Sequence, residues 1–193
     1  MCIRDSIKEI TSLVEVVKSQ LQFALQAKLS LRAEEHQALV DYFSKYSAWL
    51  SAIKNCSTVG ITKDNTSRLA EIRSQLDMLH EDFDLADGKM ELFVDNKDIH
   101  SQHGPLLIET LKFQAHAQQV TFEIERIHLE AKHMQLNTPI DQYAGRYGEL
   151  LEKEKELYKK FKDEQFQTYK TLLPMVQKQR RDISKHIKSL ANG

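Results

Sequence analysis

Two Glu-x-x-His motifs are the residues whose spacing most resembles a chemical site. They are Glu125 with His128 and Glu130 with His133. A pair of such motifs, one on each of two helices, helps to hold the metals of carboxylate-bridged di-iron bundles. Here both motifs fall in one predicted helix and start five residues apart, so they lie about 140° apart round that helix and cannot converge on one ion. We therefore predict no metal site and no cofactor.

The other reactive side chains lack the context that catalysis requires. Cys2 and Cys56 have neither metal-ligand spacing nor a disulfide framework, so we interpret both as free thiols. His100 and His103 fall in a predicted loop without a defined ligand geometry. The sequence contains no glycine-rich phosphate loop and no nucleophile elbow. It predicts a protein that is not an enzyme and has no small-molecule substrate.

The elements that must position these side chains are long helices. Only six Gly and three Pro occur in 193 residues, while Leu, Ala, Glu, Gln and Lys are abundant, as is typical of helical proteins. Apolar residues recur at alternating spacings of three and four, the pattern of coiled-coil seams. The predicted fold is all-α: three to four long antiparallel helices in a coiled-coil-like bundle, over residues 6–55, 65–100, 105–136 and 139–190.

The predicted seams differ in regularity. The first helix has one seam over residues 7–29 and another over residues 39–53, with Trp49 as a core anchor. The second helix follows a strict heptad pattern, which predicts a coiled-coil seam. Its members are Leu69, Ile72, Leu76, Leu79, Phe83, Ala86, Met90 and Phe93.

Residues that break helices separate the predicted elements. A cluster of small polar residues with Gly60 predicts a loop over 55–65. Gly104-Pro105 is the strongest internal breaker, and we predict a loop or sharp kink there. Pro174 falls inside the last helix, where the missing amide proton predicts a bend.

Charge is unevenly distributed along the chain. Residues 60–131 contain seven Lys or Arg and fourteen Asp or Glu, whereas residues 132–193 contain thirteen and eight. The basic final third is typical of a solvated helix face, and the alternative interpretation is attraction to anionic lipid or to an acidic partner. Basic residues 178–188 lack interleaved aromatic side chains, so we expect no nucleic-acid partner. No apolar run of about eighteen residues and no signal-peptide core occur, and we predict a cytoplasmic protein.

Residues 43–50 (FSKYSAWL), residues 67–72 (SRLAEI) and the basic run at 152–162 resemble the BAR domain of sorting-nexin type. The resemblance covers residues 7–193, while residues 1–6 (MCIRDS) look like a translated sequencing adapter. It implies a homodimeric scaffold of endosomal protein transport, peripheral on intracellular membranes and binding anionic curved lipid such as phosphoinositide. It also implies that the second and third helices form one long kinked central helix.

The basic charge of the last helix defines the residues that we expect to contact lipid. We select the lysines and arginines that cluster along that helix, because juxtamembrane cations are attracted to anionic headgroups. They are Lys159, Lys160, Lys162, Lys170, Lys178, Arg180 and Arg181.

An alternative resemblance is to the spectrin repeat, a three-helix coiled coil. Trp49 is similar to the Trp of that repeat's first helix, and the predicted breaks at 55–65 and 100–105 fall where its turns would be. The first helix would then continue into a neighbouring repeat. This resemblance implies a cytoskeletal spacer that binds a related helical partner and no lipid.

Overall fold

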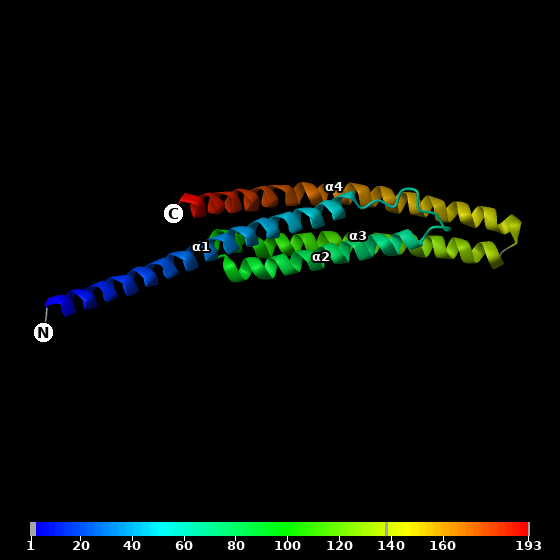
Figure 1. Cartoon of the computed structure of the whole chain (residues 1–193). Coiled ribbons are helices and arrows are strands. Elements are labelled where there is room, and N and C mark those ends of the chain that lie inside the picture. Colours follow the sequence, from blue (N-terminus) through cyan, green and yellow to red (C-terminus); the bar gives the residue numbers. More distant parts are fainter. Residues whose placement is uncertain (1–2, 138, 193) are drawn as a thin grey trace.

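The computed structural model describes residues 3–137 and 139–192, and within these ranges the only regular elements are four α-helices. Their bounds are α1 (Ile3–Asn55), α2 (Ser67–Phe93), α3 (Lys97–Asn137) and α4 (Ile140–Asn192). The chain runs up, down, up and down along one long axis (Figure 1). The prediction of an all-α bundle of long antiparallel helices is confirmed.

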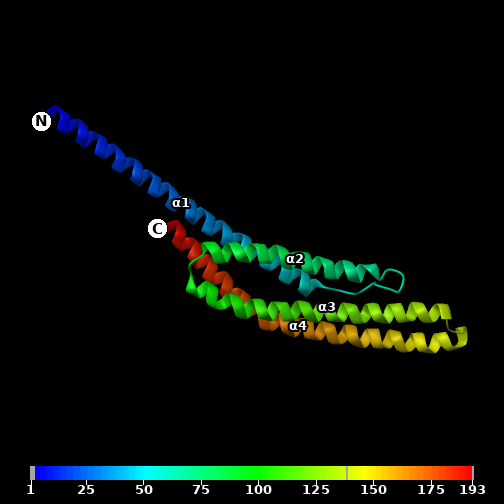
Figure 2. The same ribbon diagram turned by 90° about the horizontal axis from the view of Figure 1, so that it is seen from below.

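The four helices form two hairpins that pack together. The C-terminal half of α1 pairs with α2, and α3 pairs with α4. Within the described part of the chain α2 and α4 do not touch, because they occupy opposite sides of the bundle. The N-terminal half of α1 extends beyond the other three helices (Figure 2). The molecule is therefore a bundle with one projecting helical arm.

Aromatic rings from α1 and α2 form the centre of the core. Trp49 is fully buried, as predicted, and stacks on Phe83 with ring centroids 5.2 Å apart. Its indole Nε1 donates a hydrogen bond to Gln114 on α3. Tyr46 packs edge-on against Trp49 and shares a 2.9 Å hydrogen bond with Thr110. Because these polar atoms are paired, the buried rings fix the position of α3 without a desolvation cost.

The heptad seam of α2 faces this core as predicted. Leu69, Leu76, Phe83 and Met90 are buried at intervals of seven residues. Phe93, the last seam residue, is exposed because the helix ends there. Periodicity therefore identifies the inner face of α2 but not the position of its end.

The break between α2 and α3 lies at residues 94–96, and the prediction of a break at Gly104-Pro105 was wrong. The Asn96 side-chain oxygen accepts hydrogen bonds from the backbone N–H groups of Asp98 (3.0 Å) and Ile99 (3.2 Å). Asn96 thus caps the N-terminus of α3. Pro105 lies inside α3, where it removes one backbone hydrogen-bond donor without ending the helix.

The expectation of one kinked central helix was also wrong. The chain reverses at residues 94–96, so α2 and α3 are antiparallel neighbours (Figure 2). The bend expected in the last helix is present: α4 is continuous, and Figure 2 shows it changing direction in its C-terminal half, which contains Pro174.

Burial divides α1 into two parts. The seam over residues 39–53 is buried in the bundle, as predicted. In the first predicted seam, residues 17–29 are exposed, because no other described helix covers them. We call residues 16–33 the α1 arm.

Candidate functional site: the outer face of α4

The buried residues of α4 identify which side of this helix faces outward. Leu150, Phe161, Leu172 and Ile183 are buried against the other helices. At 3.6 residues per turn, the opposite side of the helix contains Lys170, Arg181 and the residues one turn from each. We call this side the outer face of α4.

The structure places six of the seven predicted lipid-contact residues in solvent. These are Lys159, Lys160, Lys170, Lys178, Arg180 and Arg181. Lys160 lies 3.8 Å from Glu164, while Asp163 and Glu156 are also exposed nearby. The cations in the first half of α4 are thus interspersed with acidic groups, which weakens their combined field.

Lys162 has a different task. Its ammonium group donates hydrogen bonds to the backbone oxygen of Cys56 (2.9 Å) and to Gln165 (2.8 Å), and it is partly buried. Lys162 therefore links the loop that follows α1 to α4. The Cys56 thiol is free and buried; burial raises its pKa and the Lys162 charge partly offsets that rise. Cys2 lies outside the described residues.

The second half of α4 carries the strongest positive charge. From residue 165 onward the chain contains six Lys or Arg and a single acidic residue, Asp182. Four of these cations line a shallow groove on the outer face with Gln177 and Ser184: Arg180, Arg181, Lys185 and Lys188. Lys185 and Lys188 were left out of the predicted lipid-contact residues, although their spacing of four and seven residues from Arg181 places them on the same side of the helix.

An exposed aromatic ring accompanies these cations. Phe166 is 63% exposed and lies one turn before Lys170. A large apolar ring beside lysines is typical of helices that lie in a membrane interface. Phe166 was also missed from the sequence. Its spacing of three and seven residues from the seam residues Tyr169 and Leu173 places it on the same side of the helix as the predicted seam, so periodicity gave no signal of its exposure.

Asp87, Glu91 and His103 are the described residues best arranged to hold a divalent metal ion, since their ligand atoms all lie within 4.8 Å of one another. His103 Nε2 lies 3.1 Å from Asp87, and its Nδ1 lies 3.1 Å from the Tyr42 hydroxyl. These direct contacts satisfy the imidazole, and we interpret the cluster as an ion pair that joins α2 to α3. The cluster was missed because His103 was assigned to a loop.

The Glu-x-x-His motifs do not converge, as predicted. Glu125 pairs with Arg73 of α2, while His128 lies 3.3 Å from Glu154 of α4. Glu130 and His133 face solvent. The first motif therefore divides its side chains between α2 and α4, and both side chains of the second motif are exposed.

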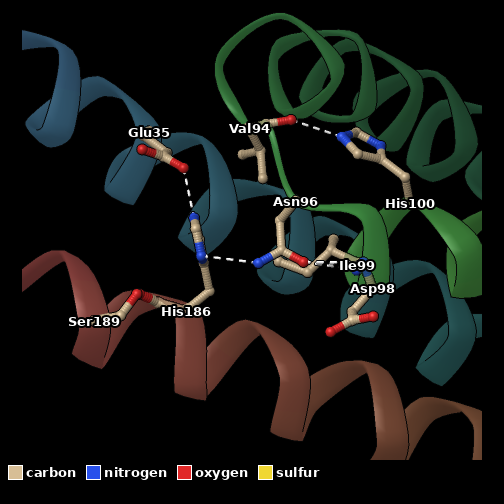
Figure 3. Close-up of polar contacts among 8 residues, drawn as sticks. All are labelled: Glu35, Val94, Asn96, Asp98, Ile99, His100, His186 and Ser189. Carbon is tan, nitrogen blue, oxygen red and sulfur yellow. Dashed lines mark hydrogen bonds and ion pairs between the residues drawn. The ribbon is translucent and has the colours of Figure 1, made fainter.

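A polar junction lies where the α1 arm leaves the bundle (Figure 3). His186 of α4 contacts Glu35 of α1 through Nε2, and its Nδ1 lies 3.0 Å from the Asn96 side-chain amide. His100 reaches back to the carbonyl oxygen of Val94. The junction thus ties the base of the arm to α4 and to the turn between α2 and α3.

The described helices include no segment that combines the length and apolar character needed to cross a bilayer. A scan of known families, a search of curated proteins and a search of solved structures returned no match to this chain.

Proposed function

We propose that this chain is a dimeric, BAR-like helical scaffold of endosomal membrane trafficking that binds anionic curved membrane through the outer face of α4. The observation that carries the proposal is the excess of six cations over one anion from residue 165 onward, beside an exposed phenylalanine. In this proposal the protein works without a catalytic centre, peripherally on the cytoplasmic side of intracellular membranes.

Electrostatics and insertion act together in this proposal. Each Lys or Arg near an anionic leaflet contributes about 1 kcal/mol of attraction, and this attraction falls off within a Debye length. The outer face of α4 can bring Lys170, Arg181 and Lys188 to the headgroups at the same time, because all three lie on one side of the helix. Phe166 then supplies an apolar contact at the acyl boundary.

One observation favours a second candidate function. The α1 arm continues the first helix beyond the bundle, as the linker helix between spectrin repeats does (Figure 1). In that case the chain is a cytoskeletal spacer that binds helical proteins and no lipid.

Co-sedimentation with liposomes separates the two candidates. The test variant combines Lys178→Glu, Arg181→Glu, Lys185→Glu and Lys188→Glu. The matched control makes the same charge change with Lys89→Glu, Lys97→Glu, Lys112→Glu and Lys132→Glu, which are exposed residues of α2 and α3. We expect the wild-type chain and the control to pellet with phosphatidylserine vesicles containing phosphoinositide, and the test variant to stay in solution. Equal pelleting of both variants would overturn the lipid proposal.

A further inference from the structure

The α1 arm extends away from the other helices (Figure 2), and its exposed apolar side chains have no partner among the described residues. Seven large apolar side chains of the arm are each at least half exposed, although Val and Leu are usually buried in helical bundles. They are Val16, Val17, Leu21, Phe23, Leu25, Leu29 and Leu31.

Part of this surface lies on the same side of α1 that faces the core farther along the helix, but here no other helix covers it. Eighteen residues make five helical turns, so residues that far apart point in the same direction. Leu21 is 66% exposed, whereas Leu39, five turns later, is fully buried. Leu31 is 60% exposed, whereas Trp49, five turns later, is also fully buried. The arm thus presents the side that the rest of α1 packs against other helices.

A second exposed apolar surface lies along the groove between α2 and α3. On α2, Met78, Leu85 and Leu92 are exposed at intervals of seven residues. On α3 the same spacing is found at four exposed residues, Ile108, Ala115, Phe122 and Leu129. Side chains of both helices line the groove at Met78 and Phe122. Two parallel heptad stripes of this kind suit a third helix.

The charges of the arm and of the groove are complementary. Residues 16–33 contain Lys18, Lys28 and Arg32 and no acidic residue. Residues 77–91 of α2 contain six Asp or Glu and one Lys. Asp77 and Glu81 line the groove itself. A basic apolar helix therefore matches an acidic apolar groove.

The arm cannot reach the groove of its own chain, because α1 is one continuous helix that leads away from α2 and α3 (Figure 2). We propose that the α1 arm of a second copy of this chain lies in the α2–α3 groove, and that the exchange is reciprocal across a two-fold axis. Residues 16–33 span about 27 Å and α2 about 40 Å, so the exposed heptad stripe of α2 is long enough to contact the whole of this segment. The inference deepens the proposed function, on which it rests, by naming the surfaces that form the dimer.

Absolute mass from light scattering after size exclusion, measured on the full chain over a range of concentrations, tests this pairing. The arm variant is Leu21→Glu with Leu31→Glu, and the groove variant is Leu85→Glu with Ile108→Glu. All four residues are exposed in the isolated chain, so the bundle itself should fold, as circular dichroism can verify. Val59→Glu with Leu151→Glu, exposed elsewhere, is the matched control.

We expect the wild-type chain and the control to have twice the chain mass, and the arm and groove variants to dimerise roughly 100-fold more weakly. A mixture of the arm variant with the groove variant should regain the dimeric mass, because one intact arm then meets one intact groove. A wild-type monomer at all concentrations, a dimeric arm or groove variant, or a mixture that stays monomeric would each overturn the pairing. Loss of liposome pelleting with an unchanged dimeric mass would instead count against the proposed function alone.

Discussion

Contacts between histidines and carboxylates connect neighbouring helices of the bundle. Four such pairs connect different helices, and each has a nitrogen within 3.3 Å of a carboxylate oxygen. The pairs are His103 with Asp87, His116 with Glu164, His128 with Glu154, and His186 with Glu35. These contacts add polar links between helices that otherwise pack through apolar side chains.

The pair of His103 and Asp87 predicts the direction in which the free energy of unfolding changes with pH. The hydrogen bond to Asp87 raises the pKa of His103 above its usual value of 6.5, although burial opposes the rise. A raised folded-state pKa stabilises the protein fully below the unfolded-state pKa, and this stabilisation is lost as pH rises through the folded-state value. We therefore expect the free energy of unfolding to fall more steeply above pH 6.5 in the wild-type chain than in His103→Gln. Urea denaturation at several pH values measures the two slopes.

His133→Gln is the control for this comparison, because His133 is exposed. It should keep the wild-type slope. His103→Gln also leaves Asp87 without its partner and lowers stability at every pH. The test therefore compares how steeply the free energy of unfolding changes with pH, and not the denaturation midpoints themselves. Parallel curves for the wild-type chain and His103→Gln would contradict the prediction.

At the scale of the elements, local sequence signals identified the helices but misplaced the break between α2 and α3. The heptad pattern located the inner face of α2 because burial follows periodicity. Gly104-Pro105 was predicted to break the helix and Asn96 was not considered, yet tertiary packing of Leu106 and Ile99 keeps α3 helical across Pro105. The basic side of α4 was predictable from spacing, whereas the anchoring of Lys162 by the carbonyl of Cys56 was not, since it joins residues far apart in sequence.

The cap at Asn96 gives a prediction at this scale. Asn96→Ala removes the acceptor of two backbone N–H groups and the contact with His186. We expect it to lower the free energy of unfolding by about 1–2 kcal/mol. Asn96→Asp keeps a capping oxygen and should lose clearly less stability. Urea denaturation compares the stability of the three proteins. An Asn96→Ala chain as stable as the wild type would contradict the stabilising role of Asn96 as the cap of α3.

At the scale of the whole molecule, the two proposed surfaces do not compete. The residues that line the α2–α3 groove include none from α4, and the outer face of α4 points away from the helices on which its buried residues pack, so a dimer formed through the groove leaves the basic faces of both copies exposed. Two linked membrane-binding faces engage one vesicle with an effective concentration that a single face lacks.

Dimerisation should therefore strengthen membrane binding. We expect the groove variant, Leu85→Glu with Ile108→Glu, to bind phosphatidylserine vesicles roughly 100-fold more weakly than the wild-type chain, although its α4 is unchanged. Its two added negative charges also repel the vesicle, so Val59→Glu with Leu151→Glu, which adds the same charge, is the reference. Vesicle titration followed by sedimentation gives the affinities. Equal affinity for the groove variant and this reference would mean that each copy binds the membrane independently, whereas a loss confined to the groove variant would show that the dimer is the unit that binds.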